Sequence, residues 1–129
     1  MLALRNTPSD AYRRVTVDAR IRGGRADDIV ALCFEQVVAE LGRALRAHEK
    51  GDAAARSDGL TRALAALTAL EMGLERTVPV AAALEQVYTA ARVAILASVT
   101  RFDAAQLEQV REDFSEIDGV LFRGLGPLL

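Results

Sequence analysis

The chain has 129 residues, enough for one domain with a sizeable hydrophobic core but with little room for a second. Its 16 lysines and arginines are balanced by 18 aspartates and glutamates, so no overall basic field is present, which argues against nucleic acid as a partner. The single cysteine, Cys33, excludes an internal disulfide. No apolar run reaches the roughly 18 residues of a membrane span, and the N-terminus lacks a signal-peptide pattern. We therefore expect a cytoplasmic protein without membrane insertion.

Residues 1–24 are expected to form an N-terminal arm. The first 25 residues hold six arginines against two aspartates. This local excess is typical of a solvated basic arm, and a specific anion site is the alternative. The arm is compatible with a short helix over residues 9–20, followed by a hinge at Arg22–Gly24.

The first long helix is expected from about residue 25 to the Gly51–Asp52 pair. Apolar positions recur there in steps of four and three, the spacing that keeps side chains on one face of an α-helix. The positions are Val30, Phe34, Val37, Leu41, Ala44 and His48. Gly51 suits the left-handed conformation that ends a helix, and Asp52 is a good N-cap for the next.

Three further helices show the same spacing. Their apolar positions are Leu60, Ala63, Leu67, Leu70 and Leu74; Leu84, Tyr88, Ala91, Ile95 and Val99; and, after an Asp103 cap, Leu107, Val110, Phe114, Ile117 and Leu121. Short connections force neighbouring helices to run antiparallel. We predict an all-α protein with an antiparallel up-down four-helix bundle in residues 25–121, an N-terminal arm or helix in 1–24 and an apolar C-terminal tail in 122–129.

The supply of reactive side chains argues against an enzyme. His48 is the only histidine, so one chain cannot build a two-histidine zinc site or a paired Glu-x-x-His metal motif. Cys33 lies in an apolar run, where a free thiol behaves as a small hydrophobe. Asp27 and Asp28 are explained by the positive end of a helix. We predict no catalytic residue, no cofactor and no metal.

The first long helix carries more apolar surface than one core face requires. At about 100° per residue, the apolar residues between Ile29 and Leu45 cover an arc of about 240°. A core-facing helix usually shows a stripe only somewhat wider than about 100°. Either this helix is central and covered on two sides, or part of its apolar arc is a partner-binding face.

Four segments of the chain carry a family resemblance. They are "DAYRR" from Asp10, "RADDIVALCFEQVVAELGRA" from Arg25, "GDAAARSDGLTRALAALTAL" from Gly51 and "AALEQVYTAARVAIL" from Ala82. In order and spacing they resemble the FliS-type flagellin export chaperones, over roughly residues 10–118. Ala11-Tyr12 match the N-terminal Ala-Tyr of that family, and Val87-Tyr88 fit its third-helix signature.

The chain also departs from the family pattern. Ala26 replaces a proline, Phe34 a tyrosine, Gln36 a glycine and Ala90 a second tyrosine, and the tryptophan common near the end of the last helix is missing. These changes keep apolar helices but remove hydroxyl groups. They leave the bundle intact and bear on which partner sequence is preferred.

The resemblance implies a cytoplasmic chaperone that binds the disordered C-terminal segment of flagellin. It would prevent premature polymerisation and aid delivery to the flagellar export apparatus, with export-gate components as further partners. A disordered client folds onto an apolar groove, and the groove candidates are Ile29, Leu32, Cys33, Val38, Val99 and Phe102. Tyr12 would belong to an N-terminal cap that covers the groove until cargo displaces it.

Two alternatives stay open at this point. One is a helical-bundle adaptor for another flagellar or secretion protein, because the cargo is not encoded in this chain. The other concerns the cargo-free state, in which the groove could join two copies of the chain as a homodimer.

Overall fold

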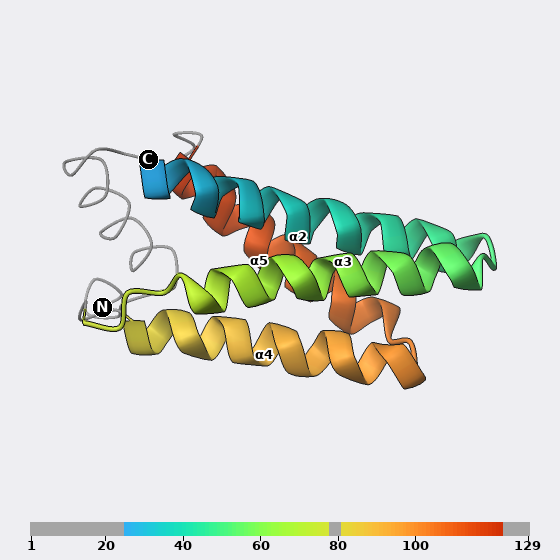
Figure 1. The fold of residues 1–129 in the computed structure, drawn as a ribbon. Coiled ribbons are helices and arrows are strands. Elements are labelled where there is room, and N and C mark those ends of the chain that lie inside the picture. The colour runs from blue at the N-terminus through green and yellow to red at the C-terminus, as the bar shows by residue number, and fades with distance from the viewer. Residues whose placement is uncertain (1–24, 78–80, 123–129) are drawn as a thin grey trace, which may run out of the picture.

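The computed structural model describes residues 25–77 and 81–122, and these form four α-helices. Helix α2 spans Arg25–Glu49, α3 spans Ala53–Met72, α4 spans Ala81–Thr100 and α5 spans Ala104–Phe122 (Figure 1). The predicted all-α bundle is therefore confirmed. The expected arm with its Tyr12, and residues 123–129 of the expected tail, lie outside the described residues.

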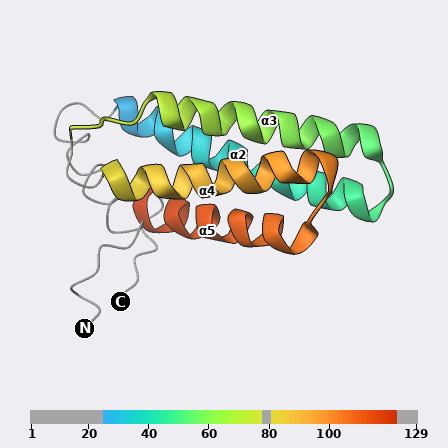
Figure 2. The same ribbon diagram turned by 90° about the horizontal axis from the view of Figure 1, so that it is seen from below.

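Consecutive helices run antiparallel, and each helix packs against two neighbours. Helix α2 packs against α3 and α5, and α4 packs against the same two helices (Figures 1 and 2). The four helices thus form a closed ring around one core. The short connections 50–52 and 101–103 leave each helix beside its predecessor, as an up-down bundle requires.

The turns use the residues that the sequence indicates. Gly51 has a φ of 72°, the left-handed conformation that costs glycine least. The Asp52 side chain caps α3 by accepting a hydrogen bond from the backbone N–H of Ala55 at 3.0 Å. Asp103 does the same for α5, accepting from the backbone N–H of Gln106 at 3.1 Å. These predicted caps satisfy N–H groups that the first turn leaves without intrahelical partners.

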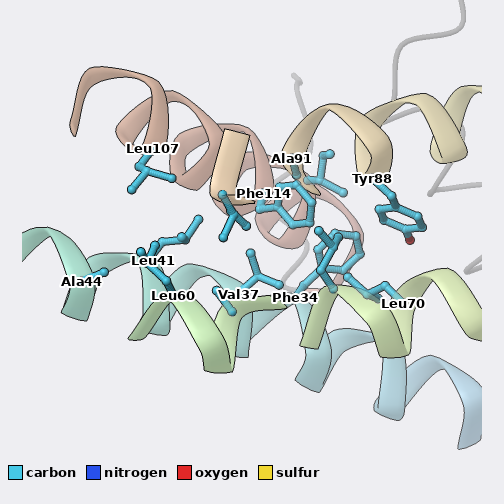
Figure 3. Packing of buried hydrophobic residues seen from close by; sticks show 14 of the residues in the cluster. Phe34, Val37, Leu41, Ala44, Leu60, Leu70, Tyr88, Ala91, Leu107 and Phe114 are labelled. Carbon is cyan, nitrogen blue, oxygen red and sulfur yellow. The ribbon is translucent and has the colours of Figure 1, made fainter. Parts of the chain in front are cut away.

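The core contains side chains from all four helices, and its aromatic rings lie together on the side of Leu70, away from Leu107 and Ala44 (Figure 3). The Phe34 and Phe114 ring centroids are 5.4 Å apart, and Tyr88 lies 6.4 Å from Phe114, distances at which tilted aromatic pairs attract one another. Burial raises the pKa of the Tyr88 phenol, which stays neutral in the core. Most of the predicted apolar positions are buried here, namely Phe34, Val37, Leu41, Ala44, Leu60, Ala63, Leu67, Leu70, Leu84, Tyr88, Ala91, Ile95, Leu107, Phe114 and Ile117.

Two positions of the predicted apolar stripes, His48 and Val99, are exposed. Each lies in the last turn of its helix, and the residue before it, Ala47 or Ser98, is the buried one there. Val30, Leu74 and Val110 are half-buried and pack against the edge of the core.

Helices α2 and α3 come into backbone contact at Gly59. A Cβ added at this glycine would lie 2.9 Å from the carbonyl oxygen of Glu40 and 3.1 Å from the Cβ of Ala44, closer than side chains pack. Position 59 therefore requires glycine because α2 comes so close to α3 there, and not because the backbone forms a turn. Glu40 and Ala44 thus lie on the face of α2 that is turned toward α3.

Candidate partner-binding surface

The outward face of α2 begins with two exposed aliphatic side chains. Ile29 keeps 58% of its accessible surface and Leu32 keeps 57%. The core side of the same helix is covered, because Phe34 and Val37 have no exposed surface. The wide apolar arc of α2 is therefore divided. One part packs into the bundle, and the part at Ile29 and Leu32 is left exposed where a partner could cover it.

Cys33 and Val38 belong to the edges of the bundle. Both are half-buried and pack against the core cluster. Burial raises the pKa of the Cys33 thiol, so the protonated, apolar form is favoured. The covered part of each side chain stabilises the bundle, and only the remaining exposed part is accessible to a partner.

A second exposed apolar surface lies on α4 and consists of Val93, Leu96 and Val99, called here the α4 strip. These side chains are 61%, 49% and 58% exposed. Sequence reasoning named only Val99. Val93 and Leu96 lie off the apolar seam of their helix, and counting the apolar arc of α4 as was done for α2 would have indicated them.

Phe102 follows α4 and packs between two other helices. Its ring stacks on His48 of α2 with centroids 4.2 Å apart, and the Arg56 guanidinium lies 5.5 Å from its centroid. Arg56 Nη1 lies 3.2 Å from His48 Nδ1. Phe102 is half-buried and ties the end of α4 to α2 and α3.

The six predicted groove residues are not brought together in one groove. Ile29, Leu32 and Cys33 lie in the first turns of α2, whereas Val99 and Phe102 lie at the end of α4. Because α2 and α4 begin at the same end of the bundle, the two groups lie at opposite ends (Figure 1). Val38 lies between them along α2. The large exposed apolar side chains of the described residues thus form two separate areas, one on α2 and one on α4, besides Met72 at the end of α3.

An ion pair joins α3 to α4 beside the α4 strip. Arg92 donates to both carboxylate oxygens of Glu71, with Nε 3.1 and 3.2 Å away, and its Nη2 donates to Thr68 Oγ1 at 2.6 Å. Planar two-point pairing of this kind orients the guanidinium. The charged group next to Val93 is therefore already engaged within the bundle.

A second charged cluster joins α2 to α3. Asp58 accepts from Arg43 at 2.7 Å and from Arg62 at 3.0 Å, and Arg43 also pairs with Glu40. The hydrogen bond from Arg43, supported by the charge of Arg62, holds the pKa of Asp58 below its usual range. Two cations and two anions balance one another, so this area attracts no particular partner charge.

Within residues 25–77 and 81–122, no group of three or more histidine, cysteine, aspartate or glutamate side chains is placed to hold a metal ion. In the same part of the chain, no helix is long and apolar enough to cross a membrane.

The comparisons with known proteins agree with the bundle. The model of the family described as flagellar protein FliS matches residues 8–120, which include nearly all of the four helices. Searches of curated proteins and of solved structures give no match. Because the family match extends over most of the chain, the protein belongs to the FliS family, a family of flagellar export chaperones and not of enzymes.

Proposed function

We propose that this chaperone binds the disordered C-terminal segment of flagellin in the cytoplasm. It keeps flagellin from polymerising before export and hands it to the export apparatus. The observation that supports this proposal is the pair of exposed apolar areas, Ile29 with Leu32 on α2 and the α4 strip, on a protein of the FliS family. Large exposed aliphatic side chains in clusters mark surfaces that another molecule covers.

A segment that folds on binding suits two separated areas better than a rigid partner does. Such a segment can form an amphipathic helix on one area, cross over the bundle and pack again on the other. It covers a large surface, but ordering the chain consumes part of the interaction free energy. The affinity therefore stays moderate, which a cargo that must later be released requires.

The side chains divide into primary and supporting contacts. Ile29, Leu32 and Val99 are exposed and are proposed to contact the client directly. Cys33, Val38 and Phe102 are half-buried and are proposed to line the margins of the client site. Tyr12 is proposed to act as a cap on the empty chaperone, and deletion of residues 1–20 tests that role through cargo affinity and solubility.

Binding of purified flagellin, and of flagellin lacking its C-terminal segment, tests the proposal by titration calorimetry. We expect heat of binding only with the intact protein. Val93→Asp should weaken binding, whereas Ala65→Asp, an exposed position on α3, should not. Equal binding of the truncated flagellin would point instead to an adaptor for another flagellar or secretion protein. Sedimentation of the cargo-free chain shows whether the exposed areas also join two copies.

A further inference from the structure

Two guanidinium groups from different helices converge on Gly42. A Cβ added at this glycine would lie 3.2 Å from Nη1 of Arg46, on α2, and 3.2 Å from Nε of Arg111, on α5. The absence of a side chain at Gly42 therefore leaves the space in which both arginines lie against α2. This arginine pair sits where α2 and α5 pack together.

The arginine pair carries more positive charge than the protein neutralises. Arg111 Nη1 donates to Glu108 Oε2 at 2.8 Å. Among the described residues Arg46 has no ion-pair partner, and the buried Nε of Arg111 finds no acceptor there. The one carboxylate at this place thus pairs with Arg111 and leaves Arg46 unneutralised. A second carboxylate at this place would be attracted by charge and could be held by paired N–H donors.

Arg46 of the arginine pair lies on the same outward line of α2 as Leu32. Leu32, Ala39 and Arg46 follow one another in steps of seven residues, which is close to two helical turns, and all three are exposed. Leu32 and Arg46 are therefore about 21 Å apart along the helix axis. A client helix lying along α2 would meet an aliphatic side chain at one end of this line and guanidinium groups at the other.

We propose that an acidic side chain of the client binds the arginine pair while an apolar side chain of the same client helix packs on Leu32. The two client residues lie about 14 positions apart, because both helices rise about 1.5 Å per residue. This inference rests on the proposed function and specifies which kinds of client side chain are recognised. Apolar contact supplies area, and the carboxylate fixes the register of the client on α2.

Titration calorimetry with a peptide of the flagellin C-terminal segment tests the inference. Arg46→Gln and Arg111→Gln should each weaken binding about tenfold, since a hydrogen-bonded charge is lost. Arg62→Gln makes the same charge change at an exposed α3 position and should alter affinity less than about twofold. Replacing the acidic residues of the peptide one at a time should reveal one whose effect disappears on the Arg46→Gln protein.

Gly42→Ala separates charge from geometry. It keeps both arginines but places a Cβ 3.2 Å from a guanidinium nitrogen of each, so both groups must shift slightly and we expect weaker binding although alanine favours the helix. Circular dichroism shows whether each variant is folded. If Arg111→Gln does not fold, the affinities of the Arg46→Gln and Gly42→Ala variants test the arginine-pair site without it. Wild-type affinity in both variants would overturn the arginine-pair site and leave the proposed function intact. No binding by the wild-type protein would overturn the proposed function itself.

Discussion

Arg92 of α4 donates hydrogen bonds to both carboxylate oxygens of Glu71 of α3, which lie 3.1 and 3.2 Å from its Nε. The two side chains are only 31% and 27% exposed, so water screens them less than it screens most surface pairs. The same guanidinium also donates to Thr68. In the described part of the chain, this is the most shielded ion pair between α3 and α4. It connects the middle of α4, next to Val93 of the α4 strip, to α3.

We expect Arg92→Ala to lower the free energy of unfolding by about 1–2 kcal/mol, because a two-point, partly shielded ion pair is lost together with a hydrogen bond. Urea denaturation followed by circular dichroism measures this. Arg76→Ala is the control, since Arg76 and Glu85 are 56% and 54% exposed and their pair should contribute less than about 0.5 kcal/mol. Equal losses in the two variants would show that shielding does not matter here.

We expect Gly59→Ala to destabilise the bundle although alanine is the better helix former. The gain in helix propensity is about 1 kcal/mol, whereas forcing apart the contact with Glu40 and Ala44 costs about 1–3 kcal/mol. The crowded atom is a backbone carbonyl oxygen, which cannot rotate away as the end of a side chain can. The thermal midpoint should fall, and a rise would mean that α2 moves aside freely.

We expect Ile29→Asp and Val37→Asp to behave oppositely, although the two residues lie on one helix. The Ile29 variant should keep its unfolding free energy within about 0.5 kcal/mol and lose flagellin binding, because this side chain is 58% exposed. The Val37 variant should not fold, because it places an unpaired charge where no surface is exposed. Thermal melts and calorimetry with flagellin separate these outcomes. Collapse of the Ile29 variant would show that this part of α2 is core.

We expect the ionised Asp58 carboxylate to stabilise the folded protein, so that the free energy of unfolding falls at acid pH. Its pKa is lower in the folded protein than in the unfolded chain, chiefly because Arg43 donates a hydrogen bond to it. Its contribution is therefore present above the unfolded pKa of about 3.9 and is lost as pH falls through the folded pKa. An NMR titration should find the pKa of Asp58 low in the wild type and closer to the usual value in Arg43→Gln. An ordinary pKa in the wild-type protein would contradict this.

Much of the fold could be predicted because local rules suffice for it. Steps of three and four residues indicate the buried face of each helix, and Gly51, Asp52 and Asp103 mark the ends. These rules act over one or two turns and need no knowledge of the neighbouring helix. They are less exact in the last turns of α2 and α4, where Ala47 and Ser98 are buried instead of the neighbouring His48 and Val99.

The surface was harder to predict because it depends on which helices meet. The sequence shows that α2 has surplus apolar residues, but only packing shows that Ile29 and Leu32 are left over while Val38 is half covered. Nothing in the spacing of Arg46 and Arg111 along the chain indicates that they meet at Gly42. That relationship arises from the pairing of α2 with α5, which local patterns do not specify.

The backbone contact at Gly59 brings α2 and α3 as close as two helices can come at this point, so a client cannot be accommodated by moving α2 nearer to α3. The spacing of these two helices is therefore set by the backbone and not by the size of a side chain at this position. Over evolution, a different spacing between α2 and α3 would require Gly59 and its neighbours on α2 to change together.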